Sequence, residues 1–495
     1  MSEPLVALSG VTKTYAGITA LDDVSLAVAP GEAVCLAGEN GSGKSTLIKI
    51  LSGVERPTRG RIRIGSEERA AMTPRAATAA GVMVIFQDFA LFPNLTVAEN
   101  IAWSRELSDG ARLFRRARVR AIAAAALERI GVALDLDAVL ETLPVAHKQV
   151  VAICRALACD ARLIIMDEPT TALTEREVQA LLDIIRRLKA DGVAVLFVSH
   201  KLAEVLAVSE RVVVLRNGRK VAEGPASEFD ARRLAQEMTG REVAETPPAP
   251  LDPAAPVLMR VEGLGKAGAF EAVSFDLRAG EVLGVAGLLG SGRTALAKAL
   301  FGLVRPEVGR VTLDGAAVPL GDPLAAARAG IGYVPEDRLT EGLFLTQSIA
   351  RNIAVGRLSD HARALGILDL AGLWGEARDW IGRLRIKAPD AEAPVRSLSG
   401  GNQQRVVLAR WMAQGPKVLI LNGPSVGVDV GSKAEIHAII ADLARHGLGV
   451  IVISDDLPEI LATCHRILVI RDGRITDTLA GGTVGEAELA HRLAS

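Results

Sequence analysis

Residues 38–46 have the composition and spacing of a phosphate-binding loop. The stretch reads Gly38-Glu39-Asn40-Gly41-Ser42-Gly43-Lys44-Ser45-Thr46. Glycines let backbone N–H groups curve around phosphates, the lysine reaches the outer phosphates, and the hydroxyl after it contacts Mg²⁺. The apolar run 34–38 predicts a strand before the loop and the residues after it predict a helix, which is the setting this chemistry needs. We therefore expect a nucleotide-phosphate site here.

Two adjacent acids end another apolar run. Residues 163–167 read LIIMD and continue with Glu168-Pro169. An aspartate at a strand end can hold Mg²⁺, and the next carboxylate can polarise a water for attack on a phosphate. A single acid after a strand is common, but an acid pair downstream of a phosphate loop predicts hydrolysis of a nucleotide triphosphate.

Three further side chains could complete such a site, although each has a plainer explanation. Gln87 ends the run 81–87 and could reach Mg²⁺ and the attacking water, or it is a surface amide. His200 ends FVSH and could donate to the γ-phosphate, or it is structural. Tyr15 could stack on adenine, or it is a half-buried packing residue.

These segments occur twice along the chain. Residues 280–295 repeat 31–46 at an offset of 249, and residues 398–413 repeat 143–158 at an offset of 255. Between the repeats, residues 241–256 contain five prolines, which favour an extended, semi-rigid linker of roughly 50 Å at ~3.1 Å per residue. The sequence therefore predicts a domain over 1–240, a proline-rich linker over 241–256 and a second domain over 257–495.

Strand-like and helix-like runs alternate within each half. The runs 34–38, 163–167 and 193–199 predict buried parallel strands, and 173–192 predicts an amphipathic helix. This alternation favours an α/β fold with a mainly parallel sheet and helices on its faces. Ligands of such sheets lie at the carboxyl ends of the strands, where the motifs above fall.

Composition narrows the class of protein. The chain has 495 residues, 49% of them hydrophobic, and a formal net charge of -1, which gives no basic footprint for nucleic acid. The start MSEPLVALSG does not resemble a signal peptide, and no uncharged apolar run approaches the ~18 residues that cross a bilayer. The four scattered cysteines lack metal-binding spacing and are expected to be reduced core thiols of a cytosolic protein.

Residues 398–405 read LSGGNQQR and, with the phosphate loop, Gln87, MDEPT and His200, resemble the ATP-binding subunits of ABC transporters. The tandem layout, GSGRT at 290–294 and YVPEDRLTEGL at 333–343 are similar to those of carbohydrate importers of the ribose, galactose and xylose kind. The resemblance implies two tandem P-loop ABC domains, each with a parallel sheet core, an antiparallel β part and a helical subdomain. It also implies ATP and Mg²⁺ as cofactors, permease subunits and a secreted solute-binding protein as partners, and a peripheral place at the cytoplasmic face of the membrane.

In that family two domains pair head to tail, so that each ATP site takes its signature element from the opposite domain. Site one would use Lys44, Gln87, Glu168 and His200 for catalysis, with Ser45, Gln87 and Asp167 at the metal. Tyr15 and the phosphate loop would bind the nucleotide, together with Ser399, Gly400, Gly401, Asn402 and the D-loop residue Asp429 from the second half. The helix expected after Ser399 would direct its positive end at the γ-phosphate.

Site two collects the substitutions from both halves. Arg293 stands for the lysine, Glu336 for the glutamine, Asn422-Gly423 for the acid pair and Asp455 for the histidine. The first half offers LPVAH at 143–147 for the signature and Thr174 for the D-loop aspartate. Either the second half serves only to donate LSGGN and bind a partner, or site two is a stable ATP clamp that does not hydrolyse.

Segments 88–101 and 337–353 are expected to face the permease, with Phe89, Phe92 and Phe344 as contact candidates unless they pack internally. The alternative functions are a twin-ABC ATPase of translation or DNA repair, a nucleoside importer, and an ATP-gated scaffold without turnover. Translation factors of this kind have long charged linkers and repair proteins have zinc or coiled-coil insertions, neither of which the sequence shows.

Overall fold

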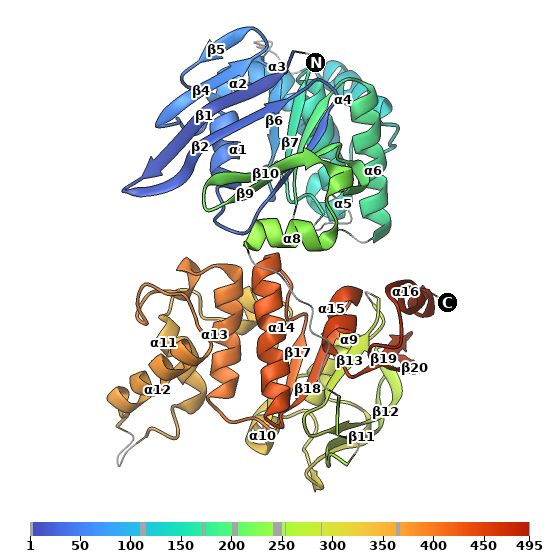
Figure 1. Ribbon diagram of the computed structural model, residues 1–495. Helices are drawn as coiled ribbons and strands as arrows, with labels where there is room; N and C mark the ends of the chain where they lie inside the picture. The colour runs from blue at the N-terminus through green and yellow to red at the C-terminus, as the bar shows by residue number, and fades with distance from the viewer. Residues whose placement is uncertain are drawn as a thin grey trace. The chain divides into compact units, whose positions relative to one another are not determined.

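The computed structural model describes residues 3–108, 115–170, 173, 175–199, 206–240, 250–252, 254–288, 290–362 and 367–494. Contacts divide the chain into two compact units, Met1–Val243 and Ala244–Ser495. Each unit is considered by itself below (Figure 1). The linker expected at 241–256 stays a prediction, because 241–249 and 253 lie outside the described residues.

Unit one contains two sheets. The antiparallel sheet has the order β2-β1-β4-β5, and the larger sheet has the order β10-β9-β3-β8-β7-β6. Their bounds are β1 Val6–Tyr15, β2 Ile18–Val28, β3 Ala33–Ala37, β4 Arg59–Ile64, β5 Glu67–Arg69, β6 Val82–Ile85, β7 Leu163–Asp167, β8 Ala194–Val198, β9 Arg211–Arg216 and β10 Arg219–Pro225. The helices are α1 Lys44–Leu51, α2 Pro74–Ala79, α3 Val97–Ser108, α4 Arg116–Ile130, α5 Val145–Ala158, α6 Glu175–Ala190 and α8 Ala231–Thr239.

Unit two repeats this plan. Its sheets have the orders β12-β11-β14-β15 and β16-β17-β18-β13-β19-β20. The strands are β11 Val257–Lys266, β12 Phe270–Arg278, β13 Val282–Ala286, β14 Val308–Leu313, β15 Ala316–Ala317, β16 Ile331–Val334, β17 Val418–Asn422, β18 Gly449–Ser454, β19 Arg466–Arg471 and β20 Arg474–Ala480. The helices are α9 Arg293–Leu300, α10 Pro323–Ala329, α11 Ile349–Ala354, α12 Leu370–Arg383, α13 Gly400–Met412, α14 Val430–Arg445, α15 Leu457–Thr463 and α16 Glu486–Ala494.

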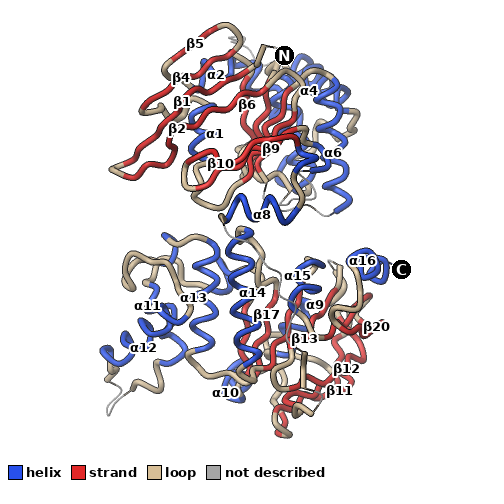
Figure 2. The backbone as a smooth tube through the Cα atoms, in the orientation of Figure 1, coloured by secondary structure: helices blue, strands red, loops and turns tan. Residues whose placement is uncertain are grey.

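Both large sheets run through the same sequence of strands, parallel except for the edge hairpins β9–β10 and β19–β20. The central strands β3 and β8 are buried along their whole length, as are β13, β17 and β18. Strands covered on both faces are expected to be continuously apolar, which their sequences are. Helices and sheets of each unit are seen in Figure 2. The predicted α/β class is confirmed, and the element ends differ from the prediction by one or two residues.

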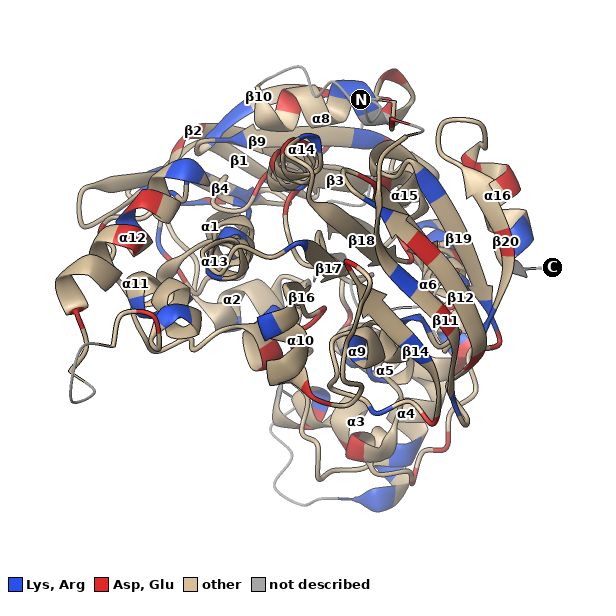
Figure 3. Ribbon diagram, turned by 90° about the horizontal axis from the view of Figure 1, so that it is seen from below, with Lys and Arg blue, Asp and Glu red and all other residues tan. Residues whose placement is uncertain are grey.

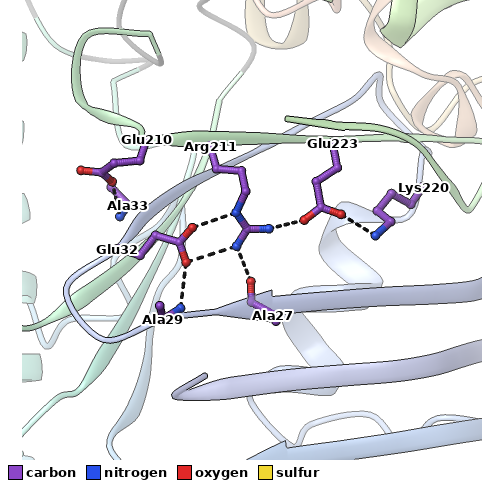
Figure 4. A network of polar contacts seen from close by, with 8 residues as sticks. All are labelled: Ala27, Ala29, Glu32, Ala33, Glu210, Arg211, Lys220 and Glu223. Atoms are coloured by element: carbon purple, nitrogen blue, oxygen red, sulfur yellow. Dashed lines mark hydrogen bonds and ion pairs between the residues drawn. The ribbon is translucent and has the colours of Figure 1, made fainter. Parts of the chain in front are cut away.

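A polar network joins the two β parts of unit one. Arg211 on β9 donates to both carboxylate oxygens of Glu32 at 2.8 and 3.1 Å, and it also contacts Glu223 and the carbonyl of Ala27 (Figure 4). Unit two has the same arrangement, in which Arg466 donates to Glu281 at 2.8 Å and to the carbonyl of Asp276. The repeat therefore extends to individual structural side chains.

Each unit carries a helical group, α3–α5 in unit one and α11–α13 in unit two, that begins after a loop held by a buried asparagine. Asn100 accepts from the Phe92 amide at 2.8 Å and donates to the Phe92 carbonyl at 3.0 Å. Asn352 binds Phe344 in the same way, at 2.9 and 3.0 Å. Both loops are thus fixed while Phe92 and Phe344 remain 46% and 56% exposed.

Both signs of charge are mixed on the surface of unit two, for example along α12 and α16 (Figure 3). Cys35, Cys154 and Cys464 are buried thiols, and Cys159 is a half-buried thiol. In the part of the chain that the structure describes, no helix is both long and apolar enough to span a bilayer.

Candidate active site

The first phosphate loop joins the end of β3 to the start of α1. Lys44 is the first residue of α1, and its ammonium donates to the carbonyls of Gly38 at 2.6 Å and Glu39 at 2.9 Å. The side chain is 9% exposed, so a buried cation closes the loop. Among the described residues, the buried Ser42 hydroxyl has no hydrogen-bond partner. An unpaired buried hydroxyl is costly unless a ligand completes it.

Neighbouring atoms lie too close to two glycines of this loop for either to carry a side chain, and a third glycine faces open space. A Cβ on Gly38 would lie 2.5 Å from both the Leu215 carbonyl and the Ser42 hydroxyl, and one on Gly43 would lie 2.6 Å from Leu21. A Cβ on Gly41 would meet no atom within 4 Å, although its φ of +81° disfavours any other residue. The loop is therefore packed on its inner side and open on the outer side, as a cradle for phosphate must be.

The acid pair stands at the carboxyl end of β7. Asp167 is its last residue and Glu168 follows with φ 49°, a left-handed conformation rare for a residue with a side chain. Burial raises the pKa of Asp167, the neighbouring charge of Glu168 raises it further, and Lys44 lowers it. Lys44 and the two acids thus form one electrostatic cluster. Strained residues and raised pKa values gather at functional sites.

Three other predicted residues of the first half, Gln87, Ser45 and Tyr15, lie within the described residues. Gln87 is exposed just after β6, and Ser45 is exposed in the first turn of α1. Tyr15 ends β1, is 37% exposed and has the Lys13 ammonium 4.7 Å from its ring centre. His200 and Thr174 lie outside the described residues, so their predicted roles are not tested.

The second phosphate loop also leads from a strand, β13, to the first residue of a helix, α9, but it carries a different cation. Arg293 begins α9, is 4% exposed and donates to the carbonyl of Gly287 at 2.6 Å. Its other terminal nitrogen lies 3.0 Å from a carboxylate oxygen of Asp455. The two residues that replace the lysine and the histidine are therefore joined in an ion pair, so a carboxylate of the chain itself is bound by the cation of the loop.

The two residues that stand for the acid pair in the second half carry neither its charge nor its backbone strain. Asn422 ends β17 and is 2% exposed, and Gly423 follows with φ 60°, close to the φ of Glu168. A Cβ on Gly423 would lie 2.8 Å from Val426 and 3.2 Å from the Glu336 side chain. The backbone turn is thus retained, while no side chain is present to orient a water.

The signature element of the second half opens α13. Ser399 is its exposed N-cap residue, and Gly400 and Gly401 form the first turn. Asn402 donates to the Ser399 hydroxyl at 2.9 Å and accepts from the Lys387 amide at 2.8 Å, which fixes the turn. In the first half Pro144 is the N-cap residue of α5 and Val145 follows, so an amide donor is lost there.

Asp429 caps α14 and accepts from the Ser432 amide at 2.8 Å. A Cβ on Gly401 would lie 2.2 Å from the Ser432 hydroxyl, so the first turns of α13 and α14 are in contact. The predicted signature and D-loop residues of the second half therefore lie at adjoining helix starts.

Comparison with known proteins identifies the architecture. The sequence model of the family described as "ABC transporter" matches residues 21–171 and again 270–426. The chain belongs to the ABC transporter family. A ribose import ATP-binding protein of Rubrobacter xylanophilus is 44% identical over 477 residues, 96% of each chain, and one of Streptomyces avermitilis is 43% identical over 473 residues, 96% of this chain and 94% of that protein.

The crystal structure of an ATP-binding cassette of an ABC transporter, in its ADP conformation, has a TM-score of 0.43 at 24% identity. It covers 48% of this chain and 96% of its own. This ABC protein is an ATP-binding ATPase with two tandem domains, and the similarity to import proteins over nearly its whole length does not favour a role in translation or DNA repair.

The sequence analysis does not predict two features of this ABC protein. The ion pair between Arg293 and Asp455 was not predicted, although the simultaneous change of lysine and histidine to residues of opposite charge was its available signal. Arg338, within YVPEDRLTEGL, was assigned no role, and it is bonded to the loop before Asp429. No periodicity or local motif indicates that contact, since 89 residues separate its partners.

Proposed function

We propose that this chain powers uptake of a sugar or sugar-like solute through a separate permease by hydrolysing ATP at a single composite site. The observation that carries the proposal is the difference between the acid positions. The first half keeps the charged, strained Glu168 beside Asp167, whereas the second half has Gly423 in the same backbone conformation. The two units would pair head to tail, so that the first phosphate loop meets the Ser399–Gly401 turn.

At this first site the residues would divide the work of phosphoryl transfer to water. Glu168 would orient and polarise the attacking water, and the Lys44 ammonium and the loop amides would hold the phosphates. The start of α13 would direct its amides at the γ-phosphate, whose charge grows in the transition state. Gln87, His200 and Tyr15 would complete the water, phosphate and adenine contacts in the roles expected from the sequence.

Mg²⁺ fits the donor set of the first half. Asp167 stands at the end of β7 with a raised pKa, and a bound dication would lower that pKa. Ser45 in α1 and Gln87 after β6 each offer an exposed side-chain oxygen. When bound, the ion would neutralise charge on the phosphate oxygens. Hard oxygen donors of this kind are the ones that Mg²⁺ prefers.

The second site would not turn over ATP. A positioned general base contributes ~10²–10⁴ in rate, or about 3–5 kcal/mol of barrier, and Gly423 provides none. The ion pair of Arg293 with Asp455 also places a carboxylate where the cation would otherwise meet phosphate. Both observations favour weak, non-productive nucleotide binding at this loop.

ATP binding would draw the two halves together, and this closure would move permease subunits docked at the cytoplasmic face of the membrane. The exposed Phe92 and Phe344, each on a loop fixed by a buried asparagine, offer apolar contacts held in a defined position. The solute class rests on the relatives named for ribose import, and a secreted binding protein would select the solute.

The decisive measurement is steady-state ATPase activity of the full chain with Glu168→Gln. A fall of a hundredfold or more is expected. Lys44→Ala and Arg293→Ala form a matched pair of loop-cation variants, and the first should lower kcat far more than the second. If Glu168→Gln keeps substantial turnover, or if the two loop variants lose activity equally, the single-site proposal is wrong.

A further inference from the structure

A π-helical turn spans Arg338–Gly342, a few residues after β16 ends at Val334. Asp337 caps it, because its carboxylate accepts from the amides of Leu339 at 3.0 Å and Thr340 at 3.1 Å and from the Thr340 hydroxyl at 2.7 Å. Turns of this type are rare and occur frequently at functional sites. The turn lies within 337–353, the segment expected to face the permease.

Arg338 connects this turn to two elements that are distant in sequence. Its guanidinium donates to the carbonyl of Gly427 at 2.8 Å and to that of Val426, both in the loop that leads to Asp429. Its Nε makes a longer contact of 3.5 Å with the Gln403 side chain of α13. Helices α13 and α14 lie side by side (Figure 1). Arg338 is bonded to residues near the start of each helix.

The packing at this junction is close enough to require glycine. A Cβ on Gly400 would lie 2.6 Å from the Gly427 carbonyl and 2.7 Å from the Arg338 guanidinium. Gly427 has φ +66°, and a Cβ there would lie 3.3 Å from the same guanidinium. The arginine therefore lies against the signature glycine Gly400 and the loop before Asp429 at once.

The far side of the turn is fixed as well. Arg410 of α13 donates to the carbonyls of Gly342 and Asn352, each at 2.7 Å. Lys298 of α9, the helix that follows the second phosphate loop, lies 2.9 Å from Glu341. The turn is thus tied to the second phosphate-loop helix, to α13 and to the loop before α14.

The first half has a simpler arrangement. Phe92 follows Gln87 by five residues, whereas Phe344 follows Glu336 by eight, and Phe89 stands where the offset of 249 places Arg338. Arg155 of α5 donates to the Phe89 carbonyl at 2.8 Å and to the Ala90 carbonyl at 2.6 Å, which parallels Arg410. Phe89 has no side-chain donor, so it cannot form the bonds that Arg338 makes in the half that keeps LSGG and Asp429.

We propose that Arg338 is a positioning residue for ATP hydrolysis: it holds the Ser399–Gly401 turn and the loop before Asp429 in register and ties both to the permease-facing segment. This inference rests on the proposed function, in which those two elements complete the first site. Arg338 would not touch ATP. Its effect would reach the γ-phosphate through the backbone of the signature turn.

The test compares Arg338→Met and Arg338→Lys with wild type in the full chain. Methionine keeps the apolar stem without donors, and lysine keeps the charge without the planar fork that spans two carbonyls. Arg310→Met, which removes an exposed ion pair with Glu262 on the antiparallel sheet, is the matched control. We measure kcat for ATP, binding of ADP to the first loop, and hydrogen exchange of residues 423–429.

Arg338→Met should lower kcat at least tenfold and speed exchange of 423–429, while ADP affinity stays within twofold, because ADP lacks the phosphate that the signature turn contacts. Arg338→Lys should fall between, and Arg310→Met should match wild type. Unchanged kcat in Arg338→Met, or equal loss of kcat and ADP affinity in both Arg338 variants, overturns the positioning role. Turnover surviving in Glu168→Gln would instead defeat the proposed single site.

Discussion

Replacing Glu168 by glycine should stabilise the first unit while abolishing its chemistry. Glu168 has φ 49°, and a left-handed residue with a side chain carries roughly 1–2 kcal/mol of strain. Glycine removes that strain but adds about 0.4–1 kcal/mol of unfolded-chain entropy. The net gain in the free energy of unfolding is thus about 0.5–1 kcal/mol, equivalent to roughly 1–4 °C in Tm for a unit of this size. ATPase activity should fall by ~10²–10⁴.

Two companion variants separate the causes. Glu168→Gln removes the charge beside Asp167 but keeps the Cβ and the strain, so the difference between the two Glu168 variants reports the relief of strain less the unfolded-chain entropy that glycine adds. Asp23→Gly relieves the same kind of strain, φ 54°, in the exposed strand β2 and should leave turnover unchanged. Thermal and denaturant unfolding of the full chain without nucleotide give the stabilities.

The reasoning is refuted if Glu168→Gly unfolds at a lower temperature than Glu168→Gln. The strain at Glu168 would then be smaller than the unfolded-chain entropy that glycine adds, and the left-handed turn would not be a strained site maintained for catalysis. If both variants are stabilised equally, repulsion between the two carboxylates, rather than backbone strain, is what the fold bears for activity.

Three further outcomes are expected. Gly423→Glu should destabilise the second unit by about 1–2 kcal/mol, because its Cβ would lie 2.8 Å from Val426 at φ +60°, and should add no turnover in a Lys44→Ala background; a gain of ATPase activity there would contradict a silent second loop. Asp455→Asn should tighten nucleotide binding at the second loop by releasing Arg293, measured with a fluorescent ATP analogue, and unchanged affinity would exclude competition by the carboxylate. Asp167→Asn should raise the free energy of unfolding at neutral pH. Burial and then the neighbouring charge raise the pKa of Asp167, so its ionisation costs free energy in the folded state. The advantage of the variant should disappear as pH falls below about 4, which unfolding at several pH values will show.

The sequence was sufficient for the fold and for the local motifs. Strands such as β7 and β8 are continuous apolar runs, and the phosphate loop is local, so periodicity and spacing predicted both. The helix expected after the Ser399–Gly401 turn is also present, as α13, and it begins at Gly400.

Long-range polar contacts were beyond the sequence. The bonds from Arg338 to Gly427 and from Arg211 to Glu32 join residues 89 and 179 apart, and a surface arginine has the same local signature as a bridging one. The left-handed φ of Glu168 was also missed, since glutamate carries no preference for it. Glycine at the matching position 423 was the available clue, because the fold repeats and glycine adopts that turn freely.

The structural contacts that both halves share suggest why the second half has been kept although its acid pair is lost. Arg466 with Glu281 repeats the pairing of Arg211 with Glu32, and Asn352 repeats the loop contacts of Asn100. General loss of constraint would erode such structural contacts together with the acid pair. The second half has lost the acid pair and the loop lysine but keeps these contacts, and its Arg338 is bonded to the loop before Asp429. This pattern supports the proposal that the second half presents the signature turn and the permease-facing segment 337–353, while Glu168 of the first half supports hydrolysis.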